Sequence, residues 1–180
     1  NALKYADFPF ICSNYDFSET ILKNTTIPYK IFNKKGVKIG VFGLGIKMEG
    51  LIDSKLYGET KYKDPIKSAN YYAKFLKNKQ KCDLVICLSH LGFEYKSNNI
   101  SDKKLAINTS NIDLIIGGHT HTFLEKAVLL KNKKNKNVLI NQAAWSALKL
   151  GRVDFFFANK KMQNIDLETH RYFSKNYAKV

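Results

Sequence analysis

Residues 113–121, DLIIGGHTH, are the stretch of sequence that decides the fold. They open with a short apolar run, Leu114–Ile116, which is too short for an independent helix and is typical of a buried strand of a parallel sheet. The two glycines that follow allow the backbone to turn tightly where this strand ends. If the next residues stay extended, His119 and His121 project to the same side, because side chains alternate along a strand. The segment therefore predicts two imidazoles beside a strand end, which is an arrangement suited to a divalent metal ion.

A second stretch, residues 83–90 (DLVICLSH), has the same layout of an acid, an apolar run and a histidine. The two Asp-Leu openings, at Asp83 and Asp113, lie 113 − 83 = 30 residues apart, which is about the length of a β-α-β unit. Neighbouring parallel strands would bring His90 and the His119/His121 pair to one carboxyl edge, where α/β sheets place their ligands.

A single histidine at a strand end is more often an ordinary polar loop residue than a ligand. Three of the four histidines, however, stand at the ends of two matched apolar strands, and this clustering favours a metal site made of His90, His119 and His121. The fourth, His170, lies in an alternating segment and is interpreted as a surface residue.

The flanking sequence predicts an α/β fold with mixed sheets. Asp64 and Pro65 are a helix cap and a first helical residue, and apolar residues recur behind them at helical spacing. A short helix is expected at 102–109. Antiparallel hairpins are expected at 26–33 with 37–43, at 127–130 with 138–141, and at 150–157 with 165–172.

The composition fits a globular domain and excludes a membrane-spanning helix. The chain has 180 residues, which fits a single domain, and a hydrophobic fraction of 44% is ordinary for a folded protein. No apolar run reaches the length of a bilayer span, and no signal peptide is visible.

The net charge of +15 raises the alternative of nucleic-acid binding. The positive residues are nearly all lysines spread along the chain, however, and the only arginines are Arg152 and Arg171. Arginine is the residue that most often reads bases and grips phosphates through two hydrogen bonds. The charge is therefore interpreted as a solvated surface that can steer anionic phosphate substrates toward a cleft, with no nucleic acid as partner.

The motifs SHLG (89–92) and GGHTH (117–121) resemble the two later metal motifs of the calcineurin-like metallophosphoesterases. Residues 8–17 (FPFICSNYDF), 38–45 (KIGVFGLG) and 141–157 (NQAAWSALKLGRVDFFF) are similar to the 5′-nucleotidase branch, which includes UDP-sugar hydrolases and 2′,3′-cyclic-nucleotide phosphodiesterases. The resemblance implies part of a four-layer αββα sandwich. It implies that residues 1–180 are one domain, the later portion of a catalytic domain, without the family's C-terminal nucleotide-recognition domain.

The same resemblance implies a dinuclear-metal phosphoesterase, most simply a 5′-nucleotidase in the periplasm or cell envelope. His90 and His119 would bind one ion and His121 the other, and Zn, Mn, Fe and Co all suit such ligands. A water molecule activated at the metal centre would attack the phosphorus of a nucleotide or another phosphate ester. Asn141 and Gln142 lie near a strand end and either support this site or satisfy core and turn groups, of which the second is favoured.

One departure from the family concerns its first three motifs, D-x-H, GD-x-x-D and GNHE, which do not occur in this sequence. In the family they supply the bridging Asp, an Asn ligand, an Asp-His pair and the general-acid His. No catalytic residue beyond the three metal ligands is therefore expected here, and a missing N-terminal segment is the expected partner. The alternative is a non-catalytic fragment or binding module that keeps the fold with an incomplete site.

Overall fold

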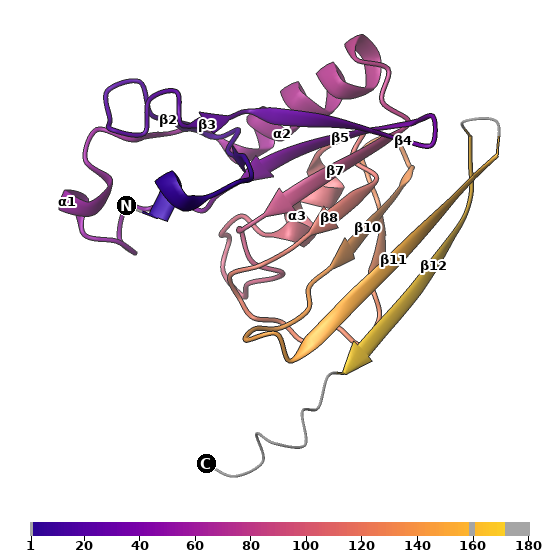
Figure 1. Ribbon diagram of the computed structural model, residues 1–180. Coiled ribbons are helices and arrows are strands. Elements are labelled where there is room, and N and C mark those ends of the chain that lie inside the picture. The colour runs from indigo at the N-terminus through magenta and orange to yellow at the C-terminus, as the bar shows by residue number, and fades with distance from the viewer. Residues whose placement is uncertain (1, 159–160, 172–180) are drawn as a thin grey trace.

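A six-stranded mixed sheet organises the chain in the computed structural model, which describes residues 2–158 and 161–171 (Figure 1). Its spatial order is β4-β5-β7-β8-β10-β9. The inner four strands run parallel and the two edge strands run antiparallel to their neighbours. The bounds are β4 (Tyr29–Lys34), β5 (Val37–Leu44), β7 (Leu84–Ser89), β8 (Leu114–Ile116), β9 (Val128–Lys131) and β10 (Asn137–Asn141). The predicted α/β fold with a mixed sheet is confirmed.

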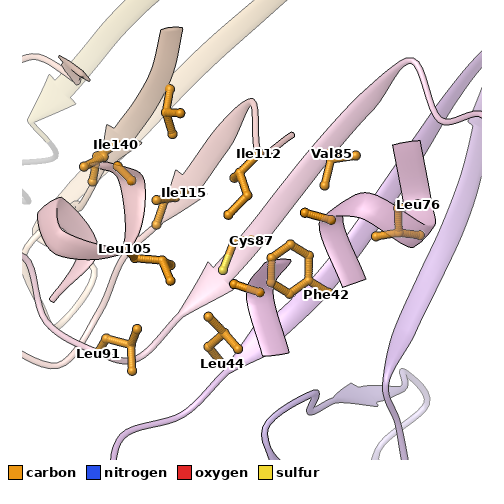
Figure 2. Close-up of a cluster of buried hydrophobic side chains, with 14 of the residues drawn as sticks. Phe42, Leu44, Leu76, Val85, Cys87, Leu91, Leu105, Ile112, Ile115 and Ile140 are labelled. Atoms are coloured by element: carbon orange, nitrogen blue, oxygen red, sulfur yellow. The ribbon is translucent and has the colours of Figure 1, made fainter. Parts of the chain in front are cut away.

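Two helices, α2 (Pro65–Lys74) and α3 (Asp102–Asn108), pack on one face of this sheet (Figure 1). The Asp64 carboxylate accepts a hydrogen bond from the Lys67 amide at 2.8 Å, as expected of a helix cap. A π-helical turn, η2 (Phe75–Lys79), extends α2. The core between helices and sheet contains fully buried side chains from every layer, among them Phe42, Leu76, Cys87, Leu105 and Ile115 (Figure 2).

Shorter elements, all from residues 2–62, lie outside the six-stranded sheet. They are η1 (Ala2–Tyr5), α1 (Ser54–Tyr57) and two small pairs of strands. The parallel pair is β1 (Phe10–Ile11) with β3 (Thr26–Ile27), and the antiparallel pair is β2 (Tyr15–Asp16) with β6 (Lys61–Tyr62). The buried Asn14 side chain joins these elements to the end of β5, since it donates to the Gly45 carbonyl and accepts from the Gly45 amide, both at 2.8 Å.

A long hairpin, β11 (Lys149–Ala158) with β12 (Lys161–Arg171), closes the described part of the chain. The sequence predicts this hairpin with a wider turn at 158–163, whereas the observed pairing continues to Ala158 and Lys161. Residue 172, which was expected in the second arm, lies outside the described residues. Within the described ranges, no helix is long and apolar enough to cross a bilayer.

The two matched aspartates of the sequence have a structural role at the starts of their strands. The Asp83 carboxylate accepts a hydrogen bond from the Lys38 amide of β5 at 2.7 Å. In the same way, Asp113 accepts from the Val85 amide of β7 at 2.7 Å, and it also pairs with the Lys77 ammonium at 2.8 Å. Each aspartate therefore ties the start of its own strand to the preceding strand of the sheet, which fixes the parallel register.

We expect Asp113→Ala to lower the free energy of unfolding by about 1–3 kcal/mol, because the Val85 amide loses its acceptor in a partly buried position. Asp113→Asn keeps an oxygen that can accept from that amide, so its free energy of unfolding should fall clearly less. Denaturant unfolding of both variants checks this. An Asn variant that is as unstable as the Ala variant would show that the Lys77 ion pair, and not the amide hydrogen bond, carries the effect.

Candidate metal centre

The parallel pairing of β7 with β8 places the predicted histidines together. Leu88 of β7 lies opposite Ile116 of β8, so both strands end at the same edge of the sheet (Figure 1). His90 follows β7 directly and His119 follows β8 after the glycine pair. The two imidazole ring centres are 5.1 Å apart, with the rings inclined at 67°.

This spacing suits two ligands of one ion. Imidazole nitrogens bind zinc at about 2.0–2.1 Å, and a tetrahedral angle at the metal then separates the two ring centres by about 5 Å. The observed 5.1 Å between His90 and His119 agrees with that value.

The glycine pair is what allows the loop to come this close. A methyl group added to Gly118 would lie 3.1 Å from Nδ1 of His90 and 3.4 Å from the carbonyl oxygen of Ser89. A methyl group on Gly117 would collide with a carboxylate oxygen of Asp102. A larger residue at 118 would therefore require His90 or the loop to shift by a few tenths of an ångström, and one at 117 would require Asp102 or the loop to move.

Residues 119–121 do not stay extended, so the condition under which His119 and His121 would project to the same side is not met. The Thr120 amide donates to the Gly118 carbonyl at 2.9 Å, which closes a tight turn, and both His119 (φ 71°) and His121 (φ 52°) occupy the left-handed region. The two histidines consequently have different neighbours. His119 lies against His90, whereas the His121 ring stacks on Trp145 with 5.7 Å between ring centres.

The electrostatic surroundings of His90 favour a neutral imidazole that can bind a metal ion. Burial lowers the pKa of His90, and the neighbouring His119 and His121 lower it further. A neutral imidazole keeps a nitrogen lone pair that can bind a cation.

Glu94, the acid that follows SHLG, is 55% exposed and pairs with Lys103 at 2.8 Å. Within the described ranges, no group of three or more His, Cys, Asp or Glu side chains is close enough to hold an ion.

Two hollows border the histidine pair. One, of about 400 Å³, lies at the ends of β5, β7 and β8 and is lined by residues that include His90, Leu88 and Ile116. Leu88 and Ile116 are 40% and 44% exposed although they belong to central strands. The other, of about 510 Å³, is mostly apolar and is lined by His119 with residues that include Tyr62 and Tyr95. The imidazoles thus stand between an open apolar sheet face and a cavity.

Asp102 is a buried acid next to the site that the sequence did not single out. It is the first residue of α3, and its carboxylate accepts a 2.5 Å hydrogen bond from the Ser89 hydroxyl, directly before His90. Its other carboxylate oxygen has no hydrogen-bond partner among the described residues. Burial raises the pKa of Asp102 to about 7, against the lowering effect of the Ser89 hydrogen bond. In sequence it looks like an ordinary acid in a first helical turn, so no local signal could have revealed it.

Gln142 lies beside the histidine loop, where its side chain makes the kind of contact that the sequence analysis favours. Its side chain satisfies polar groups of a turn, as favoured, and that turn is the GGHTH loop itself. Asn141, in contrast, is buried at the end of β10, and its side-chain oxygen has no hydrogen-bond partner among the described residues.

Asp102 should make the stability of the protein depend on pH. The folded state holds the proton up to about pH 7, whereas an unfolded chain releases it near 3.8. The stabilisation of the folded state by this proton is therefore fully present below about pH 4 and is lost as the pH rises to about 7. Above that pH this group no longer changes the stability. The free energies of unfolding of the wild type and of Asp102→Asn are measured in urea between pH 4 and 7. Over this range the wild type should lose up to about 4 kcal/mol of stability relative to the variant. Parallel pH profiles for the two proteins would contradict the raised pKa.

Comparison with known proteins places this chain in a family. The family model for calcineurin-like phosphoesterases matches residues 10–123. The 5′-nucleotidase of Vibrio cholerae is 28% identical, over 90% of this chain and 32% of its own length. The trifunctional nucleotide phosphoesterase YfkN of Bacillus subtilis is 31% identical, over 77% of this chain and 9% of its own length.

Solved structures agree. The crystal structure of a 5′-nucleotidase precursor from Thermus thermophilus matches with a TM-score of 0.78 and 26% identity, covering 94% of this chain and 34% of that one. The chain thus spans about a third of the length of the 5′-nucleotidases that it matches. It belongs to the calcineurin-like phosphoesterase family, in its 5′-nucleotidase branch.

Proposed function

We propose that this chain provides metal-binding histidines to a phosphoester hydrolase that acts on nucleotides. The observation that carries the proposal is the distance of 5.1 Å between the ring centres of His90 and His119, which follow the ends of adjacent parallel strands. Family membership adds the reaction class, because the relatives include proteins named 5′-nucleotidase and nucleotide phosphoesterase.

In this proposal His90 and His119 hold one divalent ion and His121 holds a second. Bound ions would polarise the phosphoryl oxygens and lower the pKa of a water molecule. The chain's own contribution is to bring His90 and His119 to a spacing that suits one ion and to keep His90 neutral, for which the lowered pKa of His90 is favourable. Imidazole ligands suit Zn, Mn, Fe and Co without choosing among them.

We also propose that the remaining ligands come from a part of the protein outside these 180 residues. Two cations a few ångströms apart repel each other strongly unless a carboxylate lies between them, and the family motifs that carry those carboxylates are not in this sequence. The hollow beside His90, with its exposed Leu88 and Ile116, is the surface on which a second sheet would complete a four-layer αββα sandwich. The 180 residues would then be the later portion of one catalytic domain.

The substrate's organic part is assigned to the cavity of about 510 Å³ that adjoins His119. Its aromatic and aliphatic lining, which includes Tyr62, Tyr95 and Ile100, suits a flat apolar group such as a nucleobase. The chain's net charge of +15 would attract an anionic phosphate substrate to the protein as a whole. A periplasmic or cell-envelope location is proposed from the family resemblance.

In the complete protein, His119→Ala should abolish Mn²⁺-dependent release of phosphate from AMP, by at least about a hundredfold, because the ion loses a direct ligand. His170→Ala is the matched control and should keep wild-type turnover. Circular dichroism should show the same fold for both variants. Undiminished turnover by the His119 variant at controlled metal concentration would refute the assignment.

The 180-residue chain alone, supplied with Mn²⁺ or Zn²⁺, should release no measurable phosphate from AMP, and activity should appear when the segment that its gene encodes upstream is added. The physical reason is the uncompensated charge of a second ion without its bridging carboxylate. Full turnover by the chain alone would require a different catalytic arrangement. No turnover from the complete protein would instead favour a binding module.

A further inference from the structure

We propose that Gln142 is the positioning residue that holds the GGHTH loop in the conformation that presents His119 and His121. The inference rests on the proposed metal-binding function. Gln142 would act through the loop and would not bind the metal itself.

The loop needs such support because its backbone is strained. His119 and His121 both have positive φ values, 71° and 52°. A side-chain-bearing residue in the left-handed region costs about 1 kcal/mol or more. The local hydrogen bond from the Thr120 amide to the Gly118 carbonyl is one support, and contacts from elsewhere in the fold must supply the rest.

Gln142 contacts the loop before, between and after the two histidines. Its amide nitrogen donates to the Gly118 carbonyl at 2.6 Å. Its amide oxygen accepts from the Thr120 hydroxyl at 3.1 Å and from the Thr122 amide. The two strained residues are therefore enclosed by three hydrogen bonds to a single side chain.

Gln142 is itself held rigidly. It follows β10 directly, and β10 pairs with β8 so that Asn141 lies opposite Ile116. The Gly117 amide donates to the Asn141 carbonyl at 2.8 Å, which continues that pairing into the loop. The Gln142 side chain is 1% exposed, so solvent cannot replace its partners. The strand pairing thus fixes the glutamine, and the glutamine fixes the loop.

Thr120 extends the network to the segment that follows His90. Its hydroxyl oxygen accepts from the Phe93 amide at 3.0 Å and lies 2.8 Å from the Thr122 hydroxyl. Since Thr120 has only one proton to donate and Gln142 receives it, the Thr122 hydroxyl must donate to Thr120. Every hydrogen-bonding position of the Thr120 hydroxyl is then used. One partly buried network therefore contacts the segments on both sides of the histidine pair.

The chemistry of the network requires glutamine. Methionine has nearly the same length and shape but can neither donate to Gly118 nor accept from Thr122. Removing partners that orient a metal ligand typically weakens metal binding by about 10- to 100-fold.

The test compares Gln142→Met with Asn132→Leu in the complete protein. Asn132 is the matched control because it is also buried and also organises a turn, accepting from the Lys134 and Lys136 amides at 2.8 and 3.1 Å. It lies in the turn before β10, at the other end of the same strand. The readouts are Co²⁺ affinity from visible absorption, hydrogen exchange of the Thr122 amide, and unfolding by denaturant.

Both variants should be less stable than the wild type. Only Gln142→Met should lose about 10- to 100-fold in Co²⁺ affinity and show faster exchange at Thr122. Wild-type Co²⁺ affinity in that variant would overturn the inference, and so would an equal loss of affinity in Asn132→Leu, because either result leaves Gln142 a merely stabilising role. Failure of the wild-type protein to bind Co²⁺ would instead overturn the proposed function and, with it, this inference.

Discussion

The parallel pairing of β7 with β8 is the constraint on which the rest of the structure depends. It brings two strand ends to one edge of the sheet, and so sets His90 against His119. Antiparallel strands would have carried the two histidines to opposite edges. A register slip by one residue would move one histidine by about 3.3 Å and turn every side chain of that strand to the other face. The hydrogen bonds that Asp83 and Asp113 accept from backbone amides of the preceding strands resist such a slip.

Buried polar side chains then fix the strand ends from behind. On one side, Asp102 holds the Ser89 hydroxyl directly before His90. On the other, Gln142 holds the loop that carries His119. Hydrogen bonds between buried polar groups hold these strand ends in place, because each lost partner leaves a buried group without compensation. The positions of His90 and His119 therefore depend on side chains outside the histidine pair.

Much of the fold could be predicted because it follows from local patterns. The apolar run Leu114–Ile116, the cap at Asp64 and the histidines at matched strand ends are each written in a few adjacent residues. The left-handed conformations of His119 and His121 could not be predicted in this way. They depend on Gln142, which lies 142 − 121 = 21 residues beyond the second histidine. The role of Asp102 depends likewise on packing against another strand's end, which no local pattern encodes.

The central claim is that His90 and His119 share one ion, and the most direct measurement is anomalous diffraction from crystals of the complete protein grown with Mn²⁺ or Zn²⁺. The account predicts two anomalous peaks, and at one of them an imidazole nitrogen of His90 and one of His119 should each lie about 2.0–2.2 Å away. Bound ions of which none touches both of these histidines, or two ions that divide the pair between them, would contradict it.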